Sequence, residues 1–443
     1  MNMWKRTLFR LGERIHGWNV LEIFSKLKDM ETWTPERIEA FQLDRLKKIL
    51  DHAYHHVPFY RELWNGKGVS PHDVDKLTDL RKLPKTHKTQ LLKAGDDVLD
   101  RTVDKRKFMS GRSSGSTGEP FVYYKTKFHH SWFIAGAFSG WSWAGWKIGD
   151  PWVRLQYRGN LGWSKRVEDK LFNCLYMPID KLDDDFLHSF MKKAVRFRPV
   201  MLRGYAGGIY LLADFLLRNP SYALHPQVVV STGDTLYPHY RKTIETAFQS
   251  RIFDMYGGEG MAVANQCEHG AFHLLPSVYV EFEPEGTETP DGPLSRILLT
   301  SLTNTAMPMI RYDIGDIGIP GSGPCPCGRS WKWIKKLIGR EVDIIVTKSG
   351  RHLLCHHFNI IIQKIDGIEQ FQVVQDTTDG IVIRLAVNNR YRKDPGQKIL
   401  RDEISLLGGG DMEIRFEYPK TIPLPPSGKR RYIISSLGDK HGA

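Results

Sequence analysis

The sequence has few cysteines and no long apolar segment, and both absences narrow the class of protein. Its 443 residues include five cysteines, a small and odd number that does not suit a framework of disulfides. No apolar run is long enough for a transmembrane helix. Charged residues interrupt the start of the chain, which lacks the apolar centre of a signal peptide. We therefore expect a cytoplasmic protein in a reducing compartment.

Patterns of nucleic-acid-binding proteins are also missing, although the charge would allow such a partner. The formal net charge is +13, and the basic residues are spread along the chain. No zinc-finger spacing, RNA-recognition motif or basic repeat occurs. A positive charge equally suits a polyanionic cofactor. We therefore expect small-molecule partners and no nucleic acid.

The first residues combine apolar and basic side chains at helical spacing. Trp4, Leu8, Leu11 and Ile15 recur among lysines and arginines. This pattern predicts an amphipathic terminal helix that packs against the protein. Peripheral contact of this helix with a membrane surface is the alternative.

Two kinds of pattern divide the chain. From residue 201 onward, helical stretches alternate with short apolar strands, which predicts an α/β domain with a substantial parallel sheet. Near the end, residues 381–387 and 412–418 are apolar at every second position and flank a helical stretch, which predicts a small α+β module. One core is too small for a chain of this length. We therefore expect an N-terminal domain over residues 1–339 and a C-terminal domain over 340–443.

Local signals define several elements. Residues 36–56 have the apolar stripe of a helix, which Pro58 should end. From residue 201, the stretch LRGYAGGIYLLADFL looks like a loop that leads into a buried helix. In the C-terminal module, Asp394 is the expected N-cap and Gly408 the expected stop of a helix.

Tryptophans gather in residues 128–163. A large aromatic core is the simpler interpretation, and an aromatic wall of a substrate pocket is the other. The two interpretations are compatible if the pocket wall is part of the core. The tryptophans are Trp132, Trp141, Trp143, Trp146, Trp152 and Trp163.

Residues 113–120, SSGSTGEP, form the first stretch that suggests chemistry. Glycines let backbone amides converge on an anion, and hydroxyl groups add donors without bulk. The stretch lacks the spacing of a Walker P-loop. A triphosphate is the natural guest of such a loop, and a flexible linker is the other interpretation.

Three later stretches carry charged residues in loops or turns. Asp316 is expected in a turn after a strand, where its carboxylate can accept the hydroxyls of a ribose. Arg340 and Asp343 lie at the expected domain boundary. Lys429 stands on a loop bounded by proline and glycine, from which its ammonium can project as a mobile charge.

In this order, the stretches resemble one superfamily. The chain is similar to adenylate-forming enzymes, the group of acyl-CoA synthetases, adenylation domains and luciferases. Within it, the chain looks most like the phenylacetate–CoA ligase-like branch, which includes capsule-biosynthesis ligases. The resemblance covers nearly the whole chain, and its motifs are RLKKILDHAYHHVPFYRELW, SSGSTGEP, STGDTL, IRYDIGD, GREVD and SGKRR.

The resemblance implies roles for particular residues. Lys429 would be the catalytic lysine, Asp343 the hinge, and Glu259 a catalytic residue that holds Mg²⁺. The residues implied in nucleotide binding are Ser113, Ser114, Gly115, Ser116, Thr117, Gly118, Gly233, Asp234, Tyr256, Gly257, Asp316 and Arg340.

The sequence departs from the family pattern in three places. Glu119 stands where the phosphate loop often carries lysine, so Arg112 or Lys125 would have to replace that cation. The stretch YGGEG is one residue short of the family's Tyr-Gly-x-x-Glu, and we favour Glu259 as its carboxylate because Mg²⁺ prefers oxygen ligands. Val342 also replaces a common acidic residue before the hinge.

By this resemblance, the enzyme would join a carboxylic acid to AMP from ATP and then pass the acyl group to CoA. Its fold would be a large adenylate-forming domain with parallel or mixed sheets plus a small mobile α+β lid that carries the lysine. The lid would rotate between the two half-reactions. ATP, Mg²⁺ and CoA are the implied cofactors and co-substrates.

Cysteine and histidine residues outline a second centre. Cys267, His273, Cys325 and Cys327 supply four soft ligands for a closed tetrahedral Zn²⁺ site. Many members of the branch have a similar pattern, which implies a structural role. His269 is the rival histidine.

Two further functions stay open beside the acid–CoA ligase. The acyl group could pass to an amine or hydroxyl of another acceptor, or the protein could bind ligands without catalysis. An aromatic or otherwise apolar acid is the favoured substrate, with Gly204, Tyr205 and Tyr157 as pocket candidates. The sequence also leaves a homodimer open.

Overall fold

The computed structural model describes most of the chain and divides it into two units. The first unit comprises residues 1–314 and 319–336, and the second comprises 315–318 and 337–443. Whether these units act as a catalytic domain and a moving lid stays a prediction. Outside the described residues lie 1–2, 113–120, 157–162, 179–183, 234, 341–343, 349–351, 355–357, 359–360, 363, 409, 411, 424–431 and 438–443.

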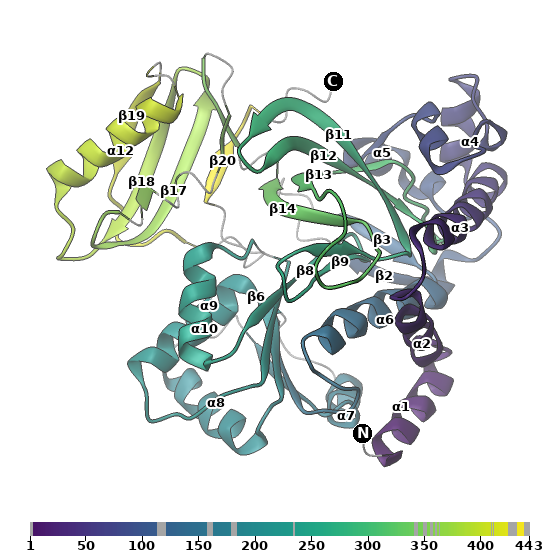
Figure 1. Cartoon of the computed structure of the whole chain (residues 1–443), viewed down its shortest axis with the longest axis horizontal. Helices are drawn as coiled ribbons and strands as arrows, with labels where there is room; N and C mark the ends of the chain where they lie inside the picture. The colour runs from purple at the N-terminus through teal and green to yellow at the C-terminus, as the bar shows by residue number, and fades with distance from the viewer. Residues whose placement is uncertain are drawn as a thin grey trace. The chain divides into compact units, whose positions relative to one another are not determined.

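Helices make up the N-terminal part of the first unit (Figure 1). They are α1 (Met3–His16), α2 (Val20–Met30), α3 (Pro35–His56), α4 (Pro58–Asn65) and α5 (Lys88–Ala94). The predicted helix 36–56 is confirmed as α3, which begins at Pro35 with the Thr34 hydroxyl accepting from the Arg37 N–H. Pro58 follows the end of α3 and also starts α4, since proline suits the first helical position. Within the described ranges, every helix is too short or too polar to span a bilayer.

A large mixed sheet organises the first unit. Its order is β11–β12–β13–β14–β10–β9–β8–β7–β6–β4–β5. The strands β5, β4, β6, β7 and β8 run parallel, and β9 turns back antiparallel to β8. Their bounds are β4 (Trp152–Gln156), β5 (Cys174–Pro178), β6 (Met201–Tyr205), β7 (Val228–Thr232), β8 (Ile252–Gly258), β9 (Met261–Gln266), β10 (Phe272–Leu274), β11 (Val278–Thr289), β12 (Gly292–Ser301), β13 (Tyr312–Pro320) and β14 (Trp333–Arg340).

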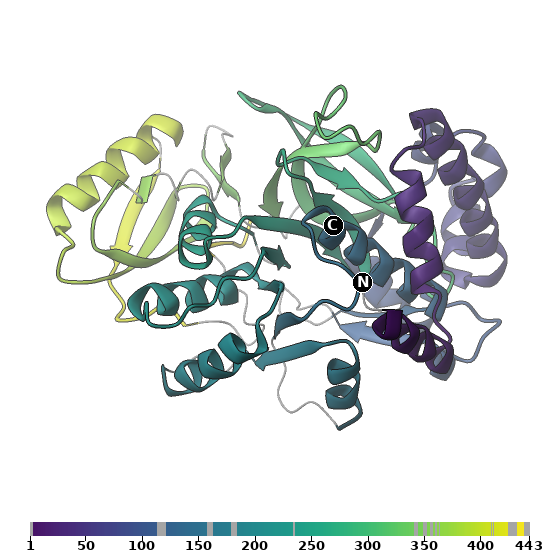
Figure 2. The same cartoon turned by 60° about the horizontal axis from the view of Figure 1, so that its bottom comes forward.

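Helices cover both faces of the parallel strands, as expected for a parallel sheet. Figures 1 and 2 show α8, α9 and α10 on one face and α6 and α7 on the other. The helices are α6 (Lys127–Trp143), α7 (Trp163–Leu171), α8 (Asp184–Phe197), α9 (Ala206–Arg218) and α10 (Pro238–Phe248). The predicted α/β architecture is confirmed. The expected loop at 201–205 is wrong, because these residues form the buried strand β6 between β4 and β7.

The second unit contains a four-stranded sheet in the order β19–β18–β17–β20. It combines β17 (Ile368–Thr377), β18 (Gly380–Val387), β19 (Glu413–Glu417) and β20 (Ile433–Ser435) with α12 (Lys393–Gly408). A hairpin of β15 (Ile344–Val346) and β16 (His352–Leu354) precedes it. The predicted α+β character is confirmed. Asp394 lies in the first turn of α12 rather than at its N-cap, since the helix begins at Lys393.

The tryptophans of α6, of β4 and of the connection between them form the aromatic core expected from the sequence. Trp132, Trp141, Trp146 and Trp152 are all buried in one cluster with apolar residues of α1, α2 and the parallel strands. Trp141 and Trp152 lie 5.1 Å apart between ring centroids. This cluster attaches the N-terminal helices to the sheet.

One buried ion pair joins the sheet to the segment before α5. The Arg311 guanidinium donates to both carboxylate oxygens of Glu281 at 3.0–3.1 Å. It also donates to the carbonyls of Arg81 and Leu83. All three guanidinium nitrogens are therefore engaged, which offsets the cost of removing the charge from water.

We predict that Arg311→Met lowers the free energy of unfolding by about 3 kcal/mol, because it leaves the partly buried Glu281 carboxylate charged and without its partner. Lys48→Met is the matched control, since the Lys48–Asp44 pair is exposed at 2.8 Å and should contribute less than about 0.5 kcal/mol. Urea unfolding measures both. Equal effects of the two changes would contradict this assignment.

Candidate active site and candidate metal centre

The turn between β8 and β9 holds the carboxylate predicted to bind Mg²⁺. Gly258 pairs with Met261, so Glu259 and Gly260 form a two-residue hairpin loop. Their φ angles are +49° and +81°, the left-handed pair that a type I′ turn requires. Glutamate rarely adopts this conformation, which is unfavourable for a side chain with a Cβ. The stretch YGGEG, which is one residue shorter than the family pattern, thus forms a tight hairpin with Glu259 at its tip.

A buried histidine ties this turn to α6. His129 Nε2 lies 3.2 Å from the Gly260 carbonyl oxygen, and its Nδ1 lies 2.7 Å from the Thr303 hydroxyl. A carbonyl oxygen can only accept, so Nε2 carries the hydrogen and Nδ1 accepts from Thr303. Burial, together with the nearby Lys125 ammonium, lowers the pKa of His129 to about 3. His129 is therefore a neutral, fixed tether at physiological pH.

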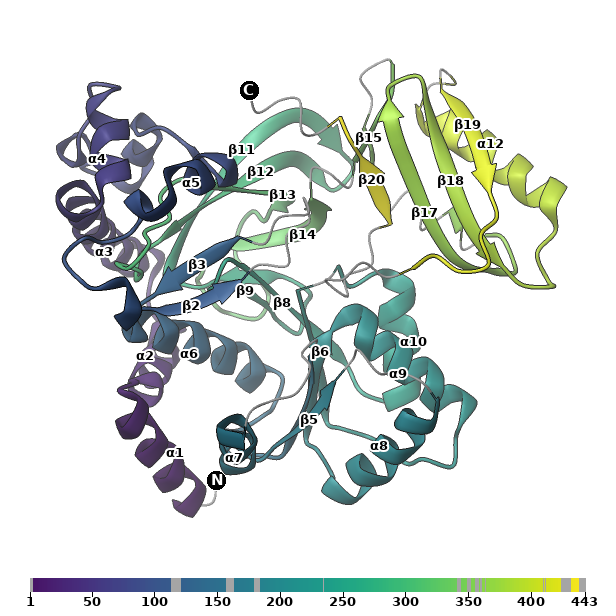
Figure 3. The same cartoon turned by 180° about the vertical axis from the view of Figure 1, so that it is seen from behind.

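The strands that flank the predicted phosphate loop lie against the same turn. Antiparallel β2 (Met109–Arg112) and β3 (Val122–Lys125) pair up to Arg112 and Val122, and Figure 3 shows them beside β8 and β9. A Cβ on Gly260 would meet the Tyr123 ring at 2.4 Å, and one on Gly111 would meet it equally closely. Tyr123 therefore fits between two glycines. Residues 113–120 themselves lie outside the described residues.

The parallel strands bring further predicted residues to one edge. Thr232 at the end of β7 pairs with Met255 of β8, so Gly233 and Tyr256 are the next residues along two neighbouring strands. Gly233 has φ of +75°, which lets the chain turn sharply there. A Cβ on Gly257 would lie 2.3 Å from the Met261 carbonyl oxygen, which explains the glycine. Ligands of open α/β sheets bind at such carboxyl ends.

The other predicted residues are placed less completely. Asp316 lies inside β13, after a kink at Gly315, rather than in a turn that follows a strand. Arg340 is the last residue of β14. Asp234, Tyr157, Val342, Asp343, Glu119 and Lys429 lie outside the described residues. Of the two candidates to replace the missing loop cation, Arg112 is exposed at the end of β2, whereas Lys125 is buried with its ammonium 5.4 Å from the Phe133 ring centroid.

The four predicted soft ligands meet in one cluster. The ligand atoms of Cys267, His273, Cys325 and Cys327 all lie within 4.8 Å of one another. Cys267 Sγ and Cys325 Sγ are 3.8 Å apart, and Cys327 Sγ is 3.1 Å from His273 Nε2. Tetrahedral Zn–S bonds of about 2.3 Å imply a sulfur–sulfur distance of about 3.8 Å. The rival His269 is exposed and outside the cluster.

The protonation states of His273 and Cys327 suit a metal, whereas the thiol of Cys325 would have to release its proton on binding. His273 Nδ1 lies 3.3 Å from the Trp331 carbonyl oxygen, so it carries the hydrogen and leaves the Nε2 lone pair facing Cys327. Burial lowers the pKa of His273 to about 4, which keeps the imidazole neutral. Burial raises the pKa of Cys325 to about 12. For Cys327 the N–H and guanidinium groups of Arg329 outweigh burial and lower the thiol pKa.

Two residues of these sites were not predicted from the sequence. His129 is a single histidine on a helix and has no motif around it. Arg329 lies 4.2 Å from the Trp143 ring centroid and bridges Glu31 and Glu268 beside the cysteine cluster. Its place directly after the CPCG stretch was the available signal, because a cation there favours thiolate.

The fold is similar to that of a solved CoA ligase. The structure superposes on 2-hydroxyisobutyryl-CoA ligase in its post-adenylation state with a TM-score of 0.73, at 17% identity and with 91% of each chain covered. This likeness confirms the fold of the adenylate-forming superfamily predicted from the sequence.

The sequence relatives define the branch. The chain is 24% identical over 412 residues to protein CapK of Staphylococcus aureus, which covers 89% of each chain. It is 25% identical over 396 residues to phenylacetate-coenzyme A ligase of Thermus thermophilus, which covers 85% of this chain and 87% of that one. Residues 345–436 match the family described as the CapK C-terminal domain. These matches support the phenylacetate–CoA ligase-like and CapK branch to which the sequence resemblance pointed.

We predict that Gly260→Ala destabilises the protein by about 2 kcal/mol or more. Alanine is unfavourable at the positive φ of this residue, and its Cβ would meet the Tyr123 ring. Gly68→Ala is the matched control: its φ is +66° but nothing lies within 4 Å, so only the backbone cost of about 1 kcal/mol remains. Urea unfolding compares them. A Gly260 variant no less stable than the control would show that Tyr123 does not restrain the turn.

Proposed function

We propose that this chain is an ATP-dependent acid–CoA ligase. The observation that carries the proposal is the match over 85% of the chain to a protein named phenylacetate-coenzyme A ligase. Further proteins of the same name match at 26–27% identity. The convergence of Gly233, Tyr256 and Glu259 at one edge of the sheet supports it.

In the first half-reaction, a carboxylate oxygen of the acid attacks the α-phosphorus of ATP. A carboxylate–phosphorus bond forms, the bond to pyrophosphate breaks, and the acyl-adenylate remains. Negative charge builds on the phosphoryl oxygens and the leaving group, so positioned cations and amide groups lower the barrier. We assign the amides of 113–118 and the Lys429 ammonium to this charge. Glu259 would hold Mg²⁺, which neutralises phosphate charge when bound.

The remaining residues are assigned to the adenine and the ribose of the nucleotide. Tyr256 would stack on the adenine, with Gly233 and Asp234 beside it. Asp316 and Arg340 would bind the ribose hydroxyls. These roles rest on the family resemblance.

In the second half-reaction, the CoA thiol attacks the acyl carbonyl carbon. A thioester forms, AMP leaves, and the thiol proton is released. We propose that the C-terminal unit then turns about Asp343 and withdraws Lys429, so that one site serves two reactions in sequence. Lys429 should therefore matter for adenylation and little for thioester formation.

Transfer to a different acceptor is the alternative. Residues 345–436 match the family described as the CapK C-terminal domain. This description names no acyl acceptor, so it is compatible with the alternative. AMP release that depends on CoA would favour the ligase. Adenylation that CoA does not affect would favour an amine or hydroxyl acceptor.

We also propose a structural Zn²⁺ bound by Cys267, His273, Cys325 and Cys327. The sulfur spacing, the neutral histidine and its correctly placed lone pair support the assignment. A closed site with four protein ligands leaves no position for substrate, so its role would be structural. It would tie the turn after β9 and strand β10 to the segment before β14.

A cytoplasmic location fits a protein with reduced cysteines, and the described cysteines form no disulfide. The exposed Leu11 and Ile15 on α1 leave peripheral membrane contact as the open alternative. A homodimer also remains a proposal.

We predict that Lys429→Ala lowers the rate of adenylation by about 100- to 1000-fold, as expected when one cation is removed from a charged transition state. Pyrophosphate release from ATP would be measured over a panel of aryl and aliphatic acids, with and without CoA. Lys420→Ala is the control, since Lys420 is exposed on the same unit.

Thioester formation from a synthetic acyl-adenylate separates the half-reactions. This rate should stay within about twofold in Lys429→Ala, because the lysine acts on the departing pyrophosphate. An equal loss in both half-reactions would contradict the assigned role. Absence of pyrophosphate release with every acid would contradict the ligase itself.

We predict about one Zn²⁺ per chain by mass spectrometry of the purified protein. Cys325→Ser should lose most of the metal and lower the melting temperature, because folding and binding of a structural metal are coupled. Cys174→Ser is the control, as this buried cysteine lies outside the cluster. A metal-free wild type whose stability is unchanged by Cys325→Ser would refute the site.

A further inference from the structure

The N-terminal helix α1 packs against the protein with a face other than the apolar stripe of its sequence. Leu11 and Ile15 belong to that stripe, yet they are 54% and 73% exposed. The residues that α1 buries are Phe9 and Glu13. The helix is therefore attached to the protein as expected, but two large aliphatic side chains of its apolar stripe are left at the surface.

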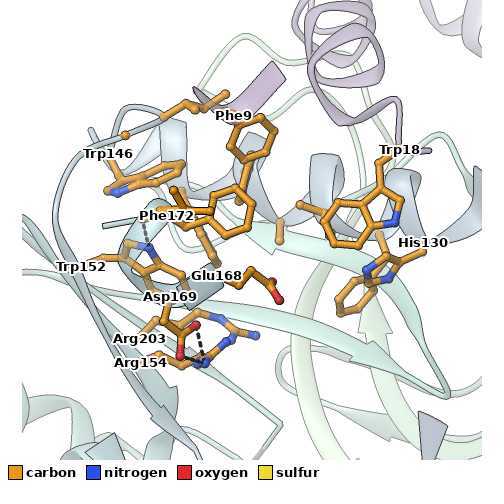
Figure 4. A pocket seen from close by; sticks show the side chains of 18 of the residues that line it. Phe9, Trp18, His130, Trp146, Trp152, Arg154, Glu168, Asp169, Phe172 and Arg203 are labelled. Carbon is orange, nitrogen blue, oxygen red and sulfur yellow. Dashed lines mark hydrogen bonds and ion pairs between the residues drawn. The ribbon is translucent and has the colours of Figure 1, made fainter. Parts of the chain in front are cut away.

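Two contacts hold α1 in this orientation. Phe9 reaches from α1 into an aromatic cavity between α1, α6 and α7, where its ring centroid lies 5.0 Å from that of Phe172 (Figure 4). The Glu13 carboxylate accepts from the Leu21 N–H at 2.8 Å. This N–H belongs to the first turn of α2, where a helix has free N–H groups and favours negative charge. Both contacts fix the same face of α1 inward.

The neighbouring helix α7 adds a second pair of exposed apolar residues. Val167 and Leu171 are one turn apart and are 47% and 52% exposed. A Cβ on Gly12 of α1 would lie 3.8 Å from the Phe172 ring, and Figures 1 and 3 show α1 and α7 side by side. The exposed apolar residues therefore lie on adjoining helices. We call four residues the α1–α7 patch: Leu11, Ile15, Val167 and Leu171.

The acidic residues of these two helices face the protein. Asp169 of α7 is buried and pairs with Arg154 at 2.7 Å. Glu168 lines the aromatic cavity, and Figure 4 shows both carboxylates on that side of α7. Glu13 of α1 is buried as well. In the described ranges of α1 and α7, the exposed residues are only aliphatic or basic: Arg10, Leu11, Arg14, Ile15, His16, Val167, Lys170 and Leu171.

The start of α6 adds a further cation beside the end of α1. A Cβ on Gly17 would lie 3.4 Å from Lys127 Nζ, and Lys127 is exposed. Basic groups from three helices therefore flank the α1–α7 patch. They are Arg10, Arg14, Lys127 and Lys170.

This composition fits an anionic lipid surface better than a protein partner. Protein interfaces favour aromatic residues and contain few lysines. In a bilayer, aliphatic side chains enter the boundary of the acyl region, while arginine and lysine keep their charges at the headgroups. A second copy of this chain would bring the same cations together in a twofold contact, which like charges oppose.

We propose that the α1–α7 patch binds peripherally to an anionic lipid membrane, with α1 lying in the plane of the interface. The four apolar residues enter the acyl boundary, and the flanking cations contact the lipid phosphates. Attraction and insertion act together, as in other basic amphipathic helices. The inference does not depend on the ligase activity, because it uses none of the predicted nucleotide residues.

The test is flotation of the full chain with vesicles. One set contains phosphatidylcholine alone, and the other contains about one third phosphatidylglycerol, which supplies the negative surface potential. The wild type should float with the anionic vesicles and bind the neutral ones at least about tenfold more weakly. Raising the salt to about 0.5 M should weaken binding, because it screens the charges.

Two double variants separate insertion from attraction. Leu11→Gln with Ile15→Gln should weaken binding about tenfold or more, because less apolar area is buried. Arg10→Gln with Arg14→Gln should also weaken it about tenfold or more, since each basic residue near the surface contributes about fivefold. Thermal melting shows that each variant is folded.

Matched controls remove the same groups elsewhere in the first unit. Leu211→Gln with Leu217→Gln removes two exposed leucines of α9. Arg61→Gln with Arg81→Gln removes two exposed arginines and the same net charge. Both controls should bind anionic vesicles as the wild type does, because neither pair lies on α1 or α7.

Several outcomes would overturn the proposal. They are absence of flotation, equal binding to both kinds of vesicle, and an equal loss in the controls. Flotation that the Leu11 and Ile15 changes leave intact would also overturn it, because insertion is part of the proposal. Sedimentation velocity covers the remaining occupant. A wild-type dimer that the same changes dissociate, with no flotation, would assign the patch to a contact between copies of the chain.

Discussion

A neutral imidazole buried between a hydroxyl and a carbonyl sets the geometry of the candidate active site. His129 connects α6 to the Gly260 turn and to Thr303 beyond β12. The turn in turn supports Tyr123, which lies next to the predicted phosphate loop. One side chain therefore joins three segments far apart in the sequence. Because burial keeps this ring uncharged, its hydrogen-bond directions do not change with pH in the physiological range.

The same helix serves two purposes. The start of α6 holds the Glu259–Gly260 turn through His129, and its next turns supply Phe133 and Trp141 to an aromatic cavity. A rigid helix that spans both places fixes the distance between them.

Much of the fold could be predicted because its signals are local. The apolar run at 228–232 and the alternation at 381–387 describe buried and half-buried strands by composition alone. Residues 201–205 misled the prediction because glycine and tyrosine near the end of the stretch resemble a loop. What makes them a strand is pairing on both sides with β4 and β7, which the local sequence does not contain.

The residues of the candidate sites also differ in how well the sequence predicts them. The spacing of Cys325 and Cys327 is typical of metal ligands. Their two partner residues, Cys267 and His273, lie close together in the chain, so the set could be predicted. Asp316 was expected in a turn, but the strand continues through it after Gly315. His129 carries no motif. Its importance comes from burial and from which groups it faces, and both depend on tertiary packing.

The placement of the cavity has a consequence for how such enzymes diverge. Its walls come largely from α1, α6 and α7, whereas the predicted nucleotide residues stand at strand ends and in loops. Substitutions at Phe9, Trp18 or Phe172 can therefore reshape this cavity without changing any predicted nucleotide residue. Related chains with identical motifs can differ in the shape of the cavity, and the N-terminal helix is the first place to compare them.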